Sequence, residues 1–492
     1  MNFFKKYFAY LIALSFIFVF FSCEDDFQAD ASGNVLVFSN DTLTFDTVFT
    51  KIGSATSKIL VYNKRSSSLS ISNIRLAGGS GSTFRINVGR ISSTNAFENI
   101  VIRGKDSLYI FVEVNLNPND VNTPVLVQDS IMFTVDNKMQ RVLLEAYGQD
   151  VEVFRGKVIT TDTILSANKP YLVYDSLRVN PDVTLTLPEG TVVYFHHNAN
   201  LLVYGNLRAT GTFDHPIVMR GDRLDKIQFP KLIDLPPIPY KYVSGQWGGV
   251  YLLSKTGNHL LNHVHMSSGY VGLYFYNEDR SYKPSLEINN SRIHNFLLYN
   301  LVAVNGDLLV TNSEISNSGS YTVYLNGGKH AFYHCTITNY FNNNRAQPIS
   351  RDANPAVMLM DLNKPLPMET IFKNCIISGS AGNEFTLASK FQQQYRGDIQ
   401  HSYIRKPKAS DLPLFSDIRW SQQTDTIIFK NIKFNYEKNQ YFDFTPDSIS
   451  PARGLANPVI AAQYPLDLSG KSRLEDGEPD AGAYEWYPTT IQ

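Results

Sequence analysis

Six short segments of the chain repeat one pattern of apolar and polar positions. In this six-residue frame, position three is Asn or His, position four is small or β-branched, and position six is aliphatic. The steps between successive fourth positions are 27, 22, 22, 40 and 27 residues. A period near 22 with alternating inward side chains is too short for a two-helix repeat, so it predicts one coil of a parallel β-solenoid. The six copies are Leu261–Met266, Ile288–Ile293, Val310–Ile315, Phe332–Ile337, Phe372–Ile377 and Ile399–Ile404.

A different pattern covers residues 35–150, where short alternating runs such as Ser107–Val114 are separated by turn signals. Roughly seven such runs predict an antiparallel β-sandwich. The region also resembles immunoglobulin-like modules of the ASPM and Hydin type in bacterial surface proteins, in Leu43–Phe45, Val61–Asn63 and Glu145–Gly148. No catalytic grouping is visible in it, so we expect a spacer or a docking module.

Residues 151–410 carry further solenoid signals in a fixed order. A Pro-x-Gly-Thr turn lies in Val183–Phe195, a Gly-x-Leu-x-Ala-x-Gly coil in Asn200–Gly211, and a Trp-x-Gly-Val strand in Gln246–Tyr251. This series closely resembles the opening coils of right-handed parallel β-helix proteins of bacterial surfaces. The resemblance implies an all-β chain, with a sandwich followed by a pectate-lyase-like solenoid. It says little about function, because this fold hosts many activities.

Residues 411–492 are expected to form terminal coils and a C-terminal cap. Pro479–Glu485 resembles the closing segment of many such β-helices, and a solenoid needs a cap because its open end exposes unpaired strand edges. Four polar residues near the end predict an ion-pair and turn network, with a metal or ligand site as the alternative. They are Asp467, Arg473, Asp480 and Glu485.

The first 22 residues are expected to be a signal peptide, because a basic pair precedes an apolar run that is short for a membrane span. Cys23 directly after this run resembles the lipobox of bacterial lipoproteins, although Phe20 stands where Leu is usual. The resemblance implies that Cys23 is lipidated. The acidic tether at 23–34 resembles the surface-export signal of Bacteroidetes lipoproteins. An uncleaved membrane anchor is the alternative, and both place the body outside the cytoplasm at a membrane.

Charge composition excludes one class of partner. The chain has 44 basic and 45 acidic residues, for a net charge of −1. Proteins that bind nucleic acid usually carry a basic excess or patch. We therefore predict no nucleic-acid partner.

Three nearby histidines, His259, His263 and His265, suggest a metal site, because residues two apart in a strand share a face. The frame favours a structural role, since position three alternates between His and Asn, which both donate and accept hydrogen bonds. We therefore predict a side-chain ladder, and neither a metal nor another cofactor. The ladder residues are His263, Asn290, Asn312, His334, Asn374 and His401.

Two cysteines, Cys335 and Cys375, occupy position four in successive frames. Neighbouring in-register strands lie about 4.8 Å apart, within the range that a disulfide tolerates. Side chains in one column point in parallel, however, so stacked inward thiols are the favoured alternative.

Position five of the frame points outward and carries mixed chemistry. A polysaccharide lyase or hydrolase needs clustered carboxylates, or a basic residue beside them. Glu314 stands alone in this column, and we assign Asp307 and Glu287 to turns or other faces. The sequence therefore favours binding over catalysis, with Arg292 and Glu314 as candidate ligand-binding residues.

Two insertions interrupt the regular coils, at Asp222–Ser244 and at Tyr340–Asp352. Long loops on a rigid scaffold often carry binding residues, and aromatic side chains stack on ligands or anchor partners. The alternative is that these loops pack across the solenoid and close exposed edges. The candidate ligand-binding residues are Tyr240, Trp247, Tyr340, Phe341, Arg345 and Arg351.

These observations lead to one expected function and two alternatives. We expect a non-enzymatic lipoprotein of the outer membrane, exposed at the cell surface, with an elongated face for a glycan or an outer-membrane protein. The first alternative is a polysaccharide lyase or glycoside hydrolase that uses an outward groove. The second is an accessory subunit of an outer-membrane complex.

Overall fold

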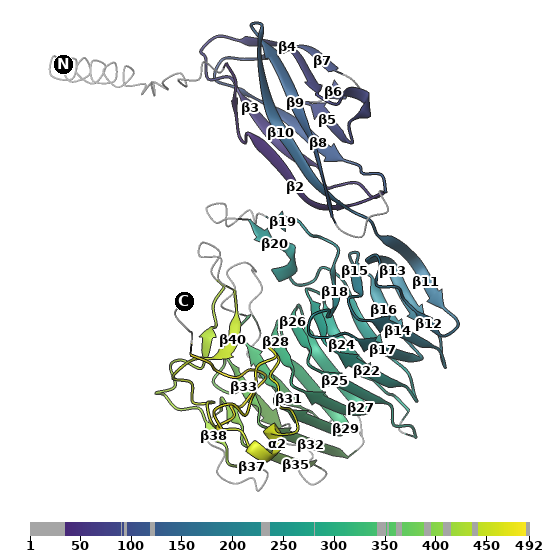
Figure 1. Cartoon of the computed structure of the whole chain (residues 1–492), viewed down its shortest axis with the longest axis vertical. Coiled ribbons are helices and arrows are strands. Elements are labelled where there is room, and N and C mark those ends of the chain that lie inside the picture. The colour runs from purple at the N-terminus through teal and green to yellow at the C-terminus, as the bar shows by residue number, and fades with distance from the viewer. Residues whose placement is uncertain are drawn as a thin grey trace, which may run out of the picture. The chain divides into compact units, whose positions relative to one another are not determined.

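The computed structural model divides the chain into two compact units (Figure 1). One unit contains Met1–Asn117 and Leu126–Gly148, and the other contains Pro118–Val125 and Gln149–Gln492. Cys23 and Arg345 lie outside the residues that the structure describes. The described residues are 35–89, 91–92, 96–118, 124–227, 237–279, 281–341, 351, 354–360, 367–387, 395–406, 415–434 and 441–488.

The N-terminal unit consists of two five-stranded sheets around one core. Antiparallel pairs include β3 (Ser57–Tyr62) with β8 (Ser107–Val114) and β4 (Leu69–Leu76) with β9 (Val125–Val135). Alternate residues such as Ile59, Val61 and Ile71 are fully buried, as expected for sheets with one face on a core and one in water. One sheet has the order β1 (Val37–Phe38), β3 (Ser57–Tyr62), β8 (Ser107–Val114), β5 (Phe84–Val88) and β6 (Ile91–Ser92). The other has the order β2 (Thr42–Phe49), β10 (Lys138–Gln149), β9 (Val125–Val135), β4 (Leu69–Leu76) and β7 (Ala96–Ile102).

The C-terminal unit is a parallel β-helix built on one 26-stranded sheet. Its strand register pairs equal positions of the six-residue frame, so that Ile293, Ile315 and Ile337 are stacked on successive coils. The predicted fold class is therefore confirmed. The first coils use β11 (Glu152–Ile159), β12 (Thr163–Ile164), β13 (Tyr171–Val179), β14 (Thr184–Pro188) and β15 (Val192–Phe195), and the last use β37 (Phe415–Ser416) and β38 (Arg419–Trp420).

Each regular coil contributes one strand to each of three faces. The charged face contains β17 (Asn206–Thr210), β22 (Asn258–Asn262), β25 (Ser285–Asn289), the second halves of β27 (Tyr299–Thr311) and β29 (Val323–Tyr333), β32 (Met368–Lys373) and β35 (Tyr395–Gln400). The covered face contains β18 (Ile217–Gly221), β23 (Val264–Ser267), β26 (Arg292–Phe296), β28 (Glu314–Ser318), β30 (Thr336–Asn339), β33 (Ile376–Gly379) and β36 (Tyr403–Ile404). The tyrosine face presents Tyr251, Tyr274 and Tyr324. It contains β16 (Asn200–Val203), β21 (Gly249–Leu252), β24 (Val271–Tyr276), the first halves of β27 and β29, β31 (Val357–Leu359) and β34 (Phe385–Leu387).

The turn between the charged and covered faces explains why position three is Asn or His. All six residues at this position have positive φ, from 47° at Asn312 to 56° at Asn374. Only a few residue types other than Gly, chiefly Asn, Asp and His, adopt this left-handed conformation with any frequency. The alternation of Asn and His predicts a hydrogen-bonding role only, and the backbone conformation is a second cause of this choice.

Side-chain hydrogen bonds join parts of this column. The Nδ2 of Asn312 donates to Oδ1 of Asn290 at 2.8 Å, and Asn290 donates to Asn262 at 3.0 Å. Asn374 and His334 are joined at 2.8 Å. His263 differs, because its Nδ1 is buried without a partner among the described residues.

Position four forms a second column inside the coils. The Ser313 hydroxyl accepts the Ser291 N–H at 3.0 Å and donates to the Thr311 carbonyl at 2.7 Å. Small polar residues therefore link one coil to the next by hydrogen bonds between side chain and backbone. Cys335 and Cys375 occupy the same column as free, fully buried thiols, and burial raises the pKa of the Cys335 thiol well above its ordinary value.

The C-terminal segment packs on the covered face. Ala481, Ala483 and Tyr484 share a buried cluster with Ile376 and Tyr403 of the solenoid. The frame's outward column is therefore not the open groove that the sequence suggested, because the cap lies over it.

A polar network holds this cap together. The Arg473 guanidinium contacts the Glu485 carboxylate at 2.8 Å and also donates to Asn312 of the ladder. Asp467 accepts the Ser469, Lys471 and Glu485 N–H groups, each at 2.8 Å. The predicted ion-pair and turn network is therefore confirmed.

One short helix, α2 (Pro458–Ala461), joins the cap to the ladder. Its N-cap residue Asn457 accepts the Val459 N–H at 2.9 Å and contacts His401 of the solenoid at 3.3 Å. No helix in the described part of the chain has the length and apolar character needed to cross a membrane.

Candidate functional site

The charged face carries two outward columns that lie immediately before the six-residue frame. Position one points inward, so residues one and three places before it point outward, because side chains alternate along a strand. The rim column is Asn258, Ser285, Asp307, Lys329, Glu369 and Arg396. The strip column is Arg208, Leu260, Glu287, Leu309, Ala331, Ile371 and Asp398.

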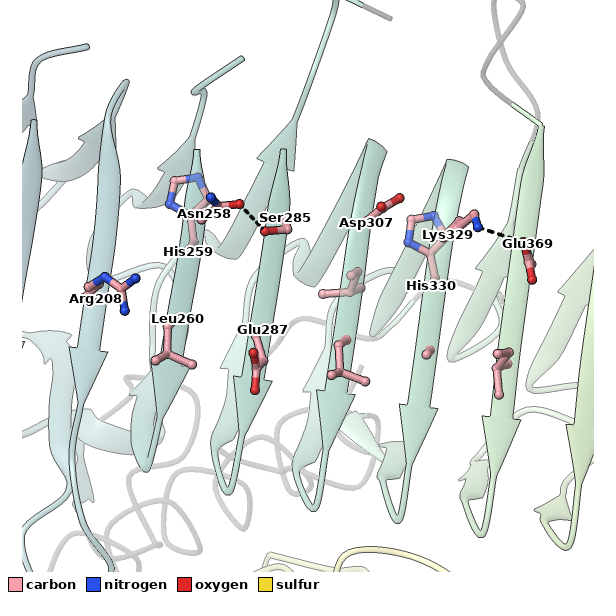
Figure 2. A pocket seen from close by; sticks show the side chains of 14 residues that line it. Arg208, Asn258, His259, Leu260, Ser285, Glu287, Asp307, Lys329, His330 and Glu369 are labelled. Carbon is pink, nitrogen blue, oxygen red and sulfur yellow. Dashed lines mark hydrogen bonds and ion pairs between the residues drawn. The ribbon is translucent and has the colours of Figure 1, made fainter. Parts of the chain in front are cut away.

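A pocket of about 500 Å³ runs along these columns across six successive strands (Figure 2). Its floor is a half-exposed apolar strip, and its rim is polar and charged. Figure 2 shows the rim side chains of Asn258, Ser285, Asp307, Lys329 and Glu369 along the upper part of the strands. The floor residues are Leu260, Leu309, Ala331 and Ile371.

Some of the polar groups bond to one another. Lys329 contacts Glu369 at 3.6 Å, and the Ser285 hydroxyl donates to Asn258 at 2.6 Å. At such exposed positions an ion pair contributes roughly 0–1 kcal/mol to folding. These groups therefore contribute little to the stability of the fold. A ligand that replaced one of their bonds would sacrifice little binding free energy in breaking it.

Two buried histidines lie beneath the pocket and point into the core. His259 accepts the Leu207 N–H at 3.3 Å, and Nε2 of His330 contacts the Gly327 carbonyl at 2.9 Å. Burial lowers the pKa of each to about 4. Both imidazoles are therefore neutral at pH 7, and the outward residues supply the charge of the site.

Three of the predicted ligand-binding aromatics are core residues. Trp247 is fully buried, lies 4.4 Å from Phe195 in a stacked arrangement, and donates its indole N–H to the Ser267 carbonyl at 2.8 Å. Phe341 and Tyr340 are 0% and 2% exposed. The binding role suggested for them does not fit, because no ring face is available to a ligand.

Arg351 is likewise buried, in a bidentate pair with Glu384. Both nitrogen–oxygen distances are 2.9 Å, and Glu384 also accepts the Ala356 and Ala381 N–H groups. This pair ties a residue within the 40-residue step to the coil that follows the step. The proposed binding role of Arg351 is corrected to a structural one.

The remaining predicted residues lie on or over the covered face. Tyr240 is half-buried, with the Arg223 guanidinium 4.3 Å from its ring. The Tyr484 hydroxyl donates to the Glu314 carboxylate, and the Arg292 guanidinium lies 5.5 Å from the Tyr484 ring. These residues are not brought together with the pocket on the charged face.

The sequence assigns Glu287 and Asp307 to turns or to faces other than that of Glu314, and both do lie on another face. Asp307 pairs with Ser285, and Glu287 pairs with Leu309, so both carboxylates belong to the charged face. The signal was present in the sequence. The residues one and three places before position one form outward rows on successive coils.

Metal binding has no geometric support among the described residues, where no three His, Cys, Asp or Glu side chains converge on one point. What the pocket offers is a linear array of carboxylates, cations, amides and hydroxyls beside an apolar strip. Such an array can hydrogen-bond many hydroxyls while covering an apolar surface.

Comparison with curated proteins gives one partial similarity. No protein-family model matches the chain. Protein bark beetle of Drosophila melanogaster is 28% identical over 144 residues, which is 27% of this chain and 4% of that protein. The chain therefore spans a very small part of this relative.

Solved structures are similar only in part. One is a family 123 glycoside hydrolase from Clostridium perfringens, at 11% identity, TM-score 0.18, and coverage of 24% of this chain and 30% of that chain. Another is the Vibrio cholerae VesB protease, at 9% identity, TM-score 0.18, and 24% and 32% coverage. A third is a protein of unknown function from Porphyromonas gingivalis W83, at 10% identity, TM-score 0.17, and 26% and 61% coverage. These scores carry no argument about the activity of this chain.

Proposed function

We propose that this chain is a non-enzymatic binding protein whose charged face takes an extended glycan. The observation that carries the proposal is the apolar strip of Leu260, Leu309, Ala331 and Ile371, which lies beside the polar rim column and is interrupted by Glu287 on β25. A pyranose has apolar C–H faces and a rim of hydroxyl groups. A linear glycan along the strip would cover the apolar carbons and present its hydroxyls to the rim.

The rim supplies the complementary hydrogen-bonding groups. Asn258 and Ser285 both donate and accept, Asp307 and Glu369 accept, and Lys329 donates. Because these side chains recur once per coil, they match a ligand that also repeats. Such a surface binds a polymer better than a single small molecule.

A matched pair of variants tests this proposal. Leu309→Asn removes apolar surface from the centre of the strip, whereas Leu202→Asn makes the same change at a half-exposed outward position of the tyrosine face. Binding to a panel of neutral and acidic polysaccharides would be measured by isothermal titration calorimetry. Covering one Leu side chain is worth about 1.5–3 kcal/mol, so we expect Leu309→Asn to weaken binding roughly tenfold or more.

The result that would overturn the proposal is equally concrete. If the unmodified chain binds no polysaccharide of the panel, or if both variants weaken binding equally, the charged face is not the site. Circular dichroism of each variant would establish that the fold is intact.

Catalysis is the second candidate function, because three carboxylates, Glu287, Asp307 and Glu369, line this pocket. Glycoside hydrolysis uses two carboxyl groups, roughly 5–10 Å apart, on either side of the scissile bond. Glu287 and Asp307 lie on neighbouring strands and are two residues apart along the strand direction. Product formation by the unmodified chain, abolished in Glu287→Gln or Asp307→Asn, would replace the binding proposal with a hydrolase or lyase.

The location of the protein is part of the same proposal. We infer an outer-membrane lipoprotein, anchored through acylated Cys23 and exposed at the cell surface, from the apolar run before Cys23 and the acidic residues after it. Labelling of the chain with a radioactive fatty acid, absent in Cys23→Ser, would support this inference. Labelling that persists in Cys23→Ser would contradict it.

An outer-membrane protein is the alternative partner, either as a ligand of the charged face or within a larger complex that includes this chain. Purification of the tagged chain from detergent-solubilised membranes would distinguish these cases. A stoichiometric protein partner that is lost in Leu309→Asn would replace the glycan with a protein ligand.

A further inference from the structure

One outer face of the N-terminal unit presents aromatic side chains to water. On β8, Tyr109 and Phe111 are 46% and 37% exposed, and the centroids of their stacked rings lie 6.4 Å apart. On the neighbouring strand β3, Leu60 pairs with Tyr109, and on the edge strand β1, Val37 pairs with Tyr62. Contiguous exposed apolar groups mark sites of interaction with proteins or membranes. The aromatic patch is Val37, Leu60, Tyr62, Tyr109 and Phe111.

Basic side chains border the aromatic patch on both sides. The Nζ atoms of Lys58 and Lys64 lie 5.7 Å and 4.7 Å from the ring centroids of Tyr109 and Tyr62. On the other side of β8, Arg85 of β5 is exposed. The patch is therefore apolar at its centre and cationic at its edges.

Acidic groups are few around this patch. Among the described outward residues of β3, β5 and β8, Glu113 is the one acidic side chain, and it accepts the Thr56 hydroxyl at 2.6 Å. Asp106, directly before β8, accepts the Ser107 N–H at 2.8 Å. The outer face of the other sheet differs, because it mixes acids and bases. Its charged residues include Asp46, Arg75, Glu98, Lys138, Arg141 and Glu145.

The chain enters this unit at the sheet that carries the patch. β1 is the edge strand of the order β1-β3-β8-β5-β6 (Figure 1). Gln140 fixes the start of this strand, because its Oε1 accepts the Val35 and Leu36 N–H groups, each at 2.9 Å. Val35 is the twelfth residue after Cys23, and an extended chain of this length spans at most about 40 Å. A membrane that holds the chain at Cys23 is therefore within reach of the patch.

We propose that the aromatic patch and its basic border dock on the anionic headgroup region of the membrane that anchors the chain. Tyrosine suits this boundary, because its ring is apolar and its hydroxyl is polar. Lysine can lay its apolar stem along the rings and keep its ammonium among the headgroup phosphates. Each basic residue near an anionic lipid surface adds to the attraction.

The proposal rests on the proposed location of the protein for the nearness of the membrane. It does not depend on the glycan groove, because the patch belongs to the N-terminal unit. The test below uses Cys23→Ser, so its outcome also does not depend on whether Cys23 is acylated.

The test compares two nitroxide labels on the full chain. Asn87→Cys places a label beside Phe111 at the patch, and Ser70→Cys places the matched control label on the exposed outer face of the other sheet. Cys335 and Cys375 are fully buried, and Cys23→Ser removes the remaining thiol. Each chain would be reconstituted into phosphatidylglycerol vesicles, with the apolar run before residue 23 as its anchor. We expect the vesicles to protect the label at Asn87→Cys, but not the label at Ser70→Cys, from a water-soluble paramagnetic reagent.

Two further variants separate the aromatic contribution from the basic one. Tyr109→Ser should reduce the protection at Asn87→Cys, whereas Tyr147→Ser, which changes a 41% exposed tyrosine of the other sheet, should leave it unchanged. Lys58→Gln removes one positive charge at an exposed position. It should lower the docking equilibrium constant about fivefold, and phosphatidylcholine vesicles should likewise protect the label less. Because Lys58 is exposed, this variant remains informative if Tyr109→Ser fails to fold.

The proposal is overturned if the vesicles protect both labels equally or neither of them. It is also overturned if protection at Asn87→Cys is the same in phosphatidylcholine as in phosphatidylglycerol, or if Lys58→Gln leaves it unchanged.

Discussion

The charged face and the covered face are built from the same coils but differ in what their outward residues touch. On the covered face, Glu314 accepts a hydrogen bond from Tyr484, and Ile376 packs in the cap's core. On the charged face, Glu287 and Lys329 are exposed. The register is equally regular on both faces, so regularity does not mark function. The difference shows that outward charged side chains stabilise the fold where a cap covers them. Where water reaches them, they are available to bind a ligand.

The largest expected effect is on the covered face. Arg473→Met removes the fully buried partner of Glu485 and leaves that carboxylate uncompensated, which costs about 3–5 kcal/mol. Chemical denaturation would measure the loss. Lys430→Met, at an exposed position of the same region, is the control and should change the free energy of unfolding by less than about 0.5 kcal/mol. Equal effects would mean that the cap does not depend on this pair.

The next largest effect on stability is expected from low pH, because acid protonates the buried histidines beneath the charged face. The folded-state pKa of His259 and His330, about 4, lies below the ordinary value of 6.5. Their contribution to stability is therefore complete above pH 6.5 and is lost as the pH falls from 6.5 to 4, by up to about 3 kcal/mol for each histidine. Denaturation midpoints at pH 7 and pH 5 would show this loss. His330→Gln should flatten the dependence, whereas His215→Gln, at an exposed position, should leave it unchanged.

A smaller effect is expected at the turn that joins the two faces. Asn290 has φ of 49° and bonds to Asn262 and Asn312. Asn290→Val adds the strain of a β-branched residue in the left-handed region, about 1–3 kcal/mol, to the loss of these bonds. Asn290→Gly loses the bonds without the strain, so the difference in unfolding free energy between the two variants isolates the backbone term. No difference would refute the conformational explanation of position three.

The smallest stability effect is expected on the charged face. Lys329→Ala and Glu369→Ala break an exposed ion pair, and each should change the free energy of unfolding by at most about 0.5 kcal/mol. Thermal denaturation of both variants would measure this. A loss comparable to that of Arg473→Met would show that the two faces do not differ in the proposed way.

Much of the fold could be predicted because solenoid repeats are local. The spacing of Ser291, Ser313 and Cys335 set the coil length, and the register of β26, β28 and β30 follows it. The cap residue Arg473 could be assigned to an ion pair because polar groups at a solenoid end must satisfy the backbone. Its contact with Asn312, 161 residues away, could not be predicted, since nothing local encodes it.

The site was harder to predict than the fold. Trp247 and Arg351 look like surface binding residues in sequence, because they follow or lie in insertions, but tertiary packing buries both. Whether an outward residue is exposed depends on what a distant segment covers. For that reason, the sequence pointed to Arg292 and Glu314 as binding residues and set Glu287 and Asp307 aside, although all four point outward.

The most direct test of the central claim is the dependence of affinity on ligand length. The pocket crosses six strands, so five strand spacings make the pocket about 24 Å long. Binding of oligosaccharides of increasing length would be measured by calorimetry for a glycan that the unmodified chain binds. The account predicts that affinity rises with each added sugar until the strip is filled and then levels off, and that Leu309→Asn reduces the gain. Affinity that does not depend on length, or that Leu309→Asn leaves unchanged, would contradict it.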